Sequence, residues 1–183
     1  ISVSHAIIGG YGGAALIKGG IGAIIVSGYT KVLIFILLAP MLGMFMAFFF
    51  SIITMWIVRD MNPRKVDKHF RKLQLVSAAL YSFIHGSNDA QKTIGIITIV
   101  LFTNQMLGAT FYVPFWVIIL SHAVIALGTL LGGWKVIKTL GMRVTKLTPF
   151  GGFSAETSAG LTIIWATILG IPVSTTHTIT GSI

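Results

Sequence analysis

The chain has 183 residues, of which 55% are hydrophobic and 9% are charged, and its formal net charge is +9. A soluble domain carries about 25% charged residues, so this composition excludes an ordinary soluble protein and predicts an all-α integral membrane protein. Cysteine is absent, which excludes a disulfide framework, a cysteine metal site and a thiol nucleophile. A charge of +9 is also typical of nucleic-acid binding, so the placement of the basic residues has to decide between the two classes.

The chain begins with a short pattern that returns near its end. Ser2–Gly9 and Ser174–Gly181 share the pattern S-x-[ST]-H-x-I-x-G without a gap. Either the pattern recurs by chance, or the gene holds two copies of one module.

The first predicted membrane span is Val32–Val58, which has 27 residues and no Asp, Glu, Lys or Arg. At about 1.5 Å per residue it is longer than a bilayer core of about 30 Å, so it can cross with some tilt. Tyr112–Trp134 is a second charge-free span, and Leu73–Thr103 is a third apolar stretch.

Two basic segments flank these apolar stretches. Arg59–Lys72 has six basic residues against two acidic ones, and Lys135–Lys146 has four more. The positive-inside rule places such loops in the cytoplasm. We therefore interpret both as orienting cytoplasmic loops rather than as sites for lipid headgroups or nucleic acid.

The polar stretch His85–Lys92 interrupts Leu73–Thr103 at membrane depth. An acid inside a membrane segment is costly and marks a functional site by default, and Gly86 permits a break in the helix. We expect an unwound segment here, in which Asn88 and Asp89 offer oxygen ligands for Na⁺ or a carboxyl group for a proton. The alternative is a short loop between two helices, with Asp89 as an N-cap.

The last segment, Phe150–Ile183, is predicted to form two short half-helices joined at Gly170-Ile171-Pro172. The hydroxyls of Ser174–Thr176 would then lie beside unpaired backbone N–H groups at the positive end of a helix dipole, which favours an anion site. The alternative is ordinary N-capping with no ligand. We expect His5 and His177 to bond a carbonyl and brace the hairpin.

Two further charged residues lie within apolar stretches. Lys92 either partners Asp89 or a bound anion, or it extends its ammonium toward the membrane surface. Glu156 precedes the apolar run Ala159–Leu169. It is either a first-turn acid favoured by the helix dipole or a carboxylate that faces the hairpin cavity and takes part in ion coupling.

Three apolar stretches separate the two copies of the motif, so the copies would enter the membrane from opposite faces. This is an inverted-topology repeat, an architecture of secondary transporters with the substrate site near the membrane midplane. The chain would then comprise the end of a first repeat (1–58), the basic loop (59–72) and most of a second repeat (73–183), which includes a re-entrant hairpin (150–183).

Three stretches, "HGSNDAQKTIGI", "GGWKVIKTLG…KLTPFGGFSAETSAG" and "GIPVSTTHTITGS", resemble in sequence and order the inorganic phosphate transporter family of secondary carriers, in its bacterial low-affinity form. The resemblance covers essentially the whole chain. It implies a carrier rather than an enzyme, with phosphate uptake coupled to Na⁺ or H⁺ and no prosthetic cofactor. It also implies a multi-pass protein of the bacterial inner membrane, usually a homodimer, whose partners are phosphate and lipid and not nucleic acid.

The resemblance also implies the site residues. Phosphate is expected at Ser174, Thr175, Thr176, Ser2, Val3, Ser4, Asn88 and Gln91. The coupling cation is expected at Asn88, Asp89, Glu156 and Thr93, and if the ion is Na⁺ its expected ligands are Asp89 and Asn88.

The sequence differs from the pattern of the family at two points, which limits the site residues that the resemblance implies. Val3 stands where the second copy of the motif has a hydroxyl residue, so a phosphate contact there would run through the backbone. The family has an Asn-Asp motif in each half, and this sequence shows one. We therefore expect the chain to be an internal piece of a longer polypeptide that does not transport on its own.

Other functions stay open at this point. A sulfate permease would use the same scaffold, although a carboxylate near the anion favours phosphate, which can donate a hydrogen bond. A channel would share the re-entrant hairpins, and saturable, gradient-dependent uptake separates a carrier from it. A hydrolase built on Ser174 and His177 lacks a Gly-x-Ser-x-Gly elbow and an orienting acid beside them.

Overall fold

Helices form the whole of the described architecture. The computed structural model describes residues 2–139, 146–171 and 173–183. Its elements are α1 (Val3–Gly19), the short 3-10 helix η1 (Ile21–Ala23), α2 (Val26–Val58), α3 (Pro63–Thr103), α4 (Phe115–Lys138), α5 (Pro149–Ile168) and α6 (Thr175–Ser182). No strand occurs in these described ranges, so the all-α prediction is confirmed.

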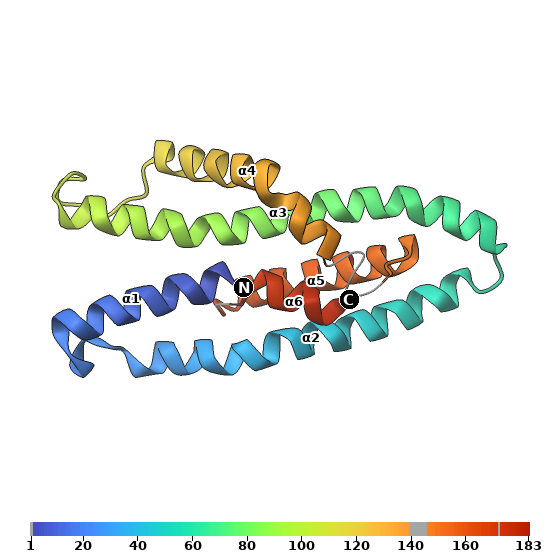
Figure 1. Ribbon diagram of the computed structural model, residues 1–183, viewed down its shortest axis with the longest axis horizontal. Helices are drawn as coiled ribbons and strands as arrows, with labels where there is room; N and C mark the ends of the chain where they lie inside the picture. The colour runs from blue at the N-terminus through green and yellow to red at the C-terminus, as the bar shows by residue number, and fades with distance from the viewer. Residues whose placement is uncertain (1, 140–145, 172) are drawn as a thin grey trace.

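Two long helices frame the molecule. Figure 1 shows α2 and α3 running along its long axis, with the α5–α6 hairpin between them and α4 beside α3. The hairpin is therefore enclosed by elements that lie far from it in the sequence, and its tip meets the middle of α3.

The two charge-free spans are helices, as predicted. Val26–Val58 and Phe115–Trp134 are both long and apolar enough to cross a membrane. Large apolar side chains cover their outer faces, and Leu131, for example, is 88% exposed. A continuous exposed apolar surface of this kind is typical of helices that face lipid.

The structure corrects the expected break in α3. This helix has 41 residues and continues through His85–Lys92, so neither the unwound segment nor the loop with Asp89 as an N-cap is present. One internal glycine costs a helix only about 1 kcal/mol relative to alanine, and a Cβ at Gly86 would meet nothing within 4 Å, so nothing forces a break there. The polar side chains find partners on α5 and α6 instead.

The basic segment Arg59–Lys72 is also mostly helical. α2 ends at Val58 and α3 begins at Pro63, with Asn62 as a side-chain N-cap that accepts a hydrogen bond from the Arg64 N–H at 3.0 Å. The predicted loop is thus reduced to a short turn. Proline fits the first position of a helix because its missing N–H has no partner there in any case. Part of the second basic segment is helical too, since α4 extends to Lys138.

The predicted hairpin break is confirmed. α5 ends at Ile168, Gly170 adopts φ +65°, and the Ile171 N–H returns to the Ala166 carbonyl at 2.8 Å. This is the geometry of a helix that stops at a glycine in the left-handed region. Pro172, which the sequence analysis placed at the break, lies outside the described residues. α5 is longer than the expected half-helix, with 20 residues.

Both copies of the repeated motif begin a helix. Ser2 caps α1 by accepting the His5 N–H at 3.4 Å, and Ser174 caps α6 by accepting the His177 N–H at 3.2 Å. The two helix starts lie together, because the His5 and His177 ring centroids are 4.9 Å apart. From this point α1 and α6 run in opposite directions (Figure 1). The repeated sequence is therefore a repeated capping motif, with its two copies head to head.

Small residues hold the hairpin against its neighbours. A Cβ at Gly181 of α6 would collide with the backbone of Pro40 in α2, and a Cβ at Gly43 of α2 would collide with the Thr178 carbonyl. Such close backbone contact is a common way to pack helices in membranes. At the other end of the hairpin the Phe70 ring packs against those of Phe150 and Phe153.

Candidate functional site

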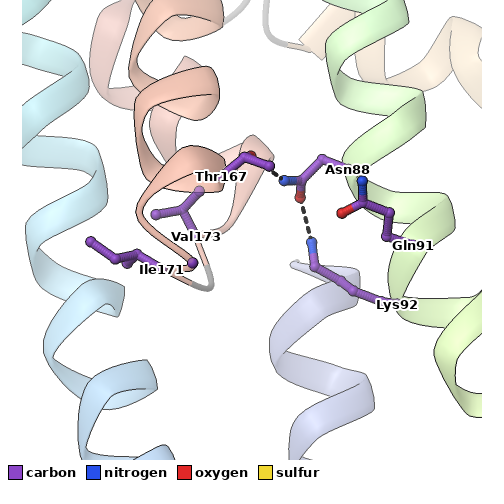
Figure 2. Close-up of a pocket in the computed structure, with 7 residues that line it drawn as sticks. Asn88, Gln91, Lys92, Thr167, Ile171 and Val173 are labelled. Carbon is purple, nitrogen blue, oxygen red and sulfur yellow. Dashed lines mark hydrogen bonds between the residues drawn. The ribbon is translucent and has the colours of Figure 1, made fainter.

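A pocket of about 230 Å³ lies where the α5–α6 turn faces the middle of α3 (Figure 2). Its lining residues are Asn88, Gln91, Lys92, Thr167, Gly170, Ile171 and Val173. The structure thus places two expected phosphate-site residues, Asn88 and Gln91, at one pocket together with Lys92. Thr167, Ile171 and Val173 were not foreseen, because nothing in their local sequence separates them from ordinary hairpin residues.

The polar side of the pocket is a short hydrogen-bonded chain. The Asn88 amide donates to the Thr167 hydroxyl at 3.1 Å, and the Lys92 ammonium donates to the Asn88 amide oxygen at 2.8 Å. Figure 2 shows both contacts: the first crosses from α3 to α5, and the second lies within α3. The hydrogen bond from Asn88 to Thr167 therefore joins residues that are 79 positions apart in the sequence.

Asp89 connects α3 to the start of α6. Its Oδ1 accepts from the Lys92 ammonium at 3.1 Å and from the Thr175 hydroxyl at 3.4 Å, and its Oδ2 lies 3.6 Å from His85 Nε2. The side chains of Asp89 and Lys92 are only 16% and 21% exposed. Of the two readings of Lys92, the structure confirms the ion pair with Asp89. Tyr81 adds a further link by donating to the Thr175 carbonyl at 3.2 Å.

The two helix starts leave backbone donors near one another. Helix geometry leaves the N–H groups of the first turn without intrahelical partners, and the helix dipole makes this end positive. At α6 these include the N–H groups of Thr175 and Thr176, and at α1 those of Val3 and Ser4. Two such ends head to head form a suitable place for an anion.

The hydroxyl groups of the two motif copies do not all face one anion site as expected, because several of them have other hydrogen-bond partners. Those of Ser2 and Ser174 act as N-caps, as the alternative of plain capping foresaw, and that of Thr175 bonds Asp89. Thr176 is half-buried, and the described structure gives its hydroxyl no hydrogen bond. Ser4 is buried, whereas Val3 is 57% exposed and offers its backbone only.

The motif histidines do not brace the hairpin through a carbonyl as expected. Their rings lie against each other, and His177 Nδ1 is buried without a hydrogen-bond partner among the described residues. The Ser174 hydroxyl faces the His177 backbone N–H rather than its ring, so the pair has no nucleophile–base arrangement.

Glu156 lies apart from the pocket. It belongs to the interior of α5, since that helix starts at Pro149, so the expectation of a first-turn acid is wrong. The buried Ser77 hydroxyl donates to its carboxylate at 2.5 Å. Ser77 precedes Asp89 by twelve residues of α3, which is about 18 Å along the helix axis. The structure therefore does not bring Glu156 and Asp89 together, and Ser77 is a partner that sequence reasoning missed.

The remaining predicted site residues are Thr93 and the possible ligands of a metal ion. Thr93 is half-buried on α3, and no hydrogen bond in the described part of the chain joins its side chain to Asp89. Among the described residues no group of three or more His, Cys, Asp or Glu side chains could hold a metal ion. Lys92 contacts both of the expected Na⁺ ligands, Asn88 and Asp89.

Comparisons with known proteins agree with the family resemblance. The chain matches the phosphate transporter family over residues 1–183. It is 52% identical over 182 residues to a probable low-affinity inorganic phosphate transporter of Rhizobium meliloti (strain 1021), covering 100% of this chain and 54% of the relative. It is 41% identical over 182 residues to a probable low-affinity inorganic phosphate transporter of Bacillus subtilis (strain 168), covering 100% of this chain and 55% of the relative.

A solved structure described as the sodium-dependent phosphate transporter has the same fold. It superposes with a TM-score of 0.79 at 23% sequence identity, covering 100% of this chain and 62% of that one. The chain spans about half the length of the curated relatives it matches. Their names are those of transporters, in line with the prediction of a protein that is not an enzyme. On the match over its full length, the chain belongs to the phosphate transporter family.

Proposed function

We propose that the full-length protein carries inorganic phosphate across the membrane, coupled to a gradient of Na⁺ or H⁺. The observation that carries this proposal is that the capped starts of α1 and α6 meet head to head. The start of α6 is bonded through Thr175 to Asp89, and Asp89 in turn pairs with Lys92. The names of the relatives support the choice of phosphate.

The polar groups at this place suit phosphate. Backbone N–H groups at helix starts donate to phosphate oxygens, and the Lys92 ammonium contributes full positive charge. Phosphate at neutral pH also carries a proton and can donate to a carboxylate such as Asp89. Sulfate lacks that proton, so the same carboxylate would repel it.

The transport step follows from the arrangement of the helices. α1 and α6 start at one point and run in opposite directions, as two inverted repeats would require (Figure 1). In our proposal one repeat rocks against the other around this point and exposes it to each side of the membrane in turn. Coupling requires that the cation and the phosphate each raise the affinity of the other.

The remaining assignments come from the family and are proposals for the whole protein. They are a multi-pass position in a bacterial inner membrane, assembly as a homodimer, and participation of Thr93 and Glu156 in coupling. Removal of the Glu156 carboxylate tests the last point, since uptake and its dependence on the gradient can be measured separately.

Uptake of radiolabelled phosphate by the full-length protein in proteoliposomes tests the proposed function. Na⁺ and H⁺ gradients are imposed separately, and excess sulfate is added as a competitor. We expect saturable uptake that one gradient drives and sulfate leaves unchanged. Inhibition by sulfate would move the assignment to a sulfate permease, and uptake that neither saturates nor follows a gradient would indicate a channel.

A further inference from the structure

Lys92 places its ammonium on the two oxygens that a sodium ion at this site would use. Its Nζ lies 2.8 Å from Asn88 Oδ1 and 3.1 Å from Asp89 Oδ1. The three residues share one face of a continuous helix, because positions three and four apart are neighbours on a helix surface. We propose that Lys92 is a tethered cation that occupies the Asn88–Asp89 site and excludes Na⁺ from it.

The local charge balance is already complete without a metal ion. The Asp89 carboxylate pairs with Lys92, and its other described contacts are the Thr175 hydroxyl and His85 Nε2. Both members of the ion pair are largely buried, so water screens them weakly. A second positive charge about 4 Å from the ammonium would be repelled strongly enough to weaken its binding roughly a thousandfold.

The oxygens that would bind a hard cation here already have partners. Sodium, like other hard cations, is held by several oxygen atoms. Asn88 lines the pocket and Asp89 follows it on α3, and the ammonium bonds Oδ1 of each. The pocket also holds the Thr167 hydroxyl, which accepts from the Asn88 amide, and Gln91, which is exposed. The fold is shared with a transporter described as sodium-dependent, but at 23% identity. Which cation lies at this place therefore depends on the side chains and not on the fold. In this chain the cation is the ammonium of Lys92.

A first experiment measures Na⁺ binding without transport. The full-length protein, purified in detergent, is unfolded thermally in NaCl and in choline chloride of equal ionic strength. An ion that binds only the folded state raises the unfolding temperature in a saturable way. We expect a smaller rise for the wild type than for Lys92→Ala, because an Asn-Asp motif in the other half of the protein contributes equally to both. Lys92→Ala frees both oxygens and should gain a saturable rise with Na⁺ and with methylammonium, whereas Lys18→Ala, at an exposed lysine of α1, should behave as the wild type does.

A folded Lys92→Ala whose saturable Na⁺ effect is no larger than that of the wild type overturns the inference. If Lys92→Ala fails to fold, Lys92→Met, which keeps the length of the side chain without its charge, is compared with the wild type by the same criterion. The inference deepens the proposed function and rests on it only for the transport readout that follows.

A second experiment uses uptake of radiolabelled phosphate into proteoliposomes under a proton gradient. Replacing Na⁺ by choline should lower uptake by Lys92→Ala at least about tenfold more than uptake by the wild type, and Na⁺ or methylammonium should restore it. Equal dependence of the wild type and Lys92→Ala on Na⁺ overturns the inference and leaves the proposed function intact. Absence of phosphate uptake under every gradient overturns the proposed function, and the unfolding experiment then still decides on Lys92.

Discussion

The two copies of the repeated motif fold alike and have different surroundings. Ser2 and Ser174 cap their helices in the same way, by accepting the N–H three residues ahead. At the next position, Val3 is 57% exposed, whereas Thr175 is buried and donates to Asp89. The cap therefore depends on local sequence alone, while the polar network depends on what packs around it.

The last position of the motif shows the same contrast. A Cβ at Gly9 would meet nothing within 4 Å, but a Cβ at Gly181 would meet the backbone of Pro40. One glycine is a helix residue in open space, and the other allows α6 to lie against α2. Matched substitutions in the two copies can therefore separate capping, packing and ligand binding.

The largest expected effect is at the acid that contacts only the second copy. Asp89→Asn should lower phosphate uptake by the full-length protein about a hundredfold, because the Lys92 ammonium loses its carboxylate in a largely buried place. The matched control is Asp67→Asn, which removes an exposed partner of Arg71 and should change uptake by less than about twofold. Equal effects of the two substitutions in an uptake assay would contradict the role given to Asp89.

Packing at the two glycines should give the next largest effect. Gly181→Ala should lower the free energy of unfolding by about 1–3 kcal/mol, because the added methyl group forces α6 away from α2. Gly9→Ala should leave stability unchanged or raise it by up to about 1 kcal/mol through helix propensity. Thermal unfolding in detergent measures both. A loss at Gly9 as large as that at Gly181 would mean that the two copies are packed alike.

Substitutions at the second position of each motif copy test the polar network around Asp89. Thr175→Val removes the hydroxyl that bonds Asp89 and should lower uptake about tenfold, the effect of one lost hydrogen bond to a charged group. Val3→Thr adds a hydroxyl at an exposed position and should change uptake by less than about twofold. If Val3→Thr has the larger effect, the assignment of the network to the second copy is wrong.

The smallest expected effect is the loss of a helix N-cap, and it should be the same in both copies of the motif. Ser2→Ala and Ser174→Ala each remove an N-cap and should cost about 1 kcal/mol of stability. Unfolding experiments on each single variant check this. A cost at one serine alone would show that the two caps are not equivalent.

Much of this architecture follows from patterns within single segments. Charge-free runs predicted the spans Val32–Val58 and Tyr112–Trp134, the second of which is helical from Phe115, and Gly170-Ile171-Pro172 predicted the hairpin break. The serine of the repeated motif predicted two helix starts, because capping needs only a neighbour three residues away. Asn88 and Asp89 were identified because polar residues inside an apolar stretch are costly unless they have a function.

What the sequence did not predict depends on contacts between distant segments. The stretch His85–Lys92 appeared to be a break, but its side chains gain partners from α5 and α6, so the helix continues. The hydrogen bond from Ser77 to Glu156 joins residues 79 positions apart, and no local pattern marks it. For the same reason the pocket residue Thr167 was missed, because only folding brings it to Asn88.

Distances between bound phosphate and the backbone nitrogens of the two helix starts test the central claim most directly. Solid-state NMR can measure phosphorus–nitrogen dipolar coupling in the full-length protein with isotope-labelled amides. Our account predicts coupling to Thr175 and Thr176 of α6 and to Val3 and Ser4 of α1, at the separation of about 4 Å that an N–H···O–P hydrogen bond gives. Bound phosphate that couples to neither helix start would contradict it.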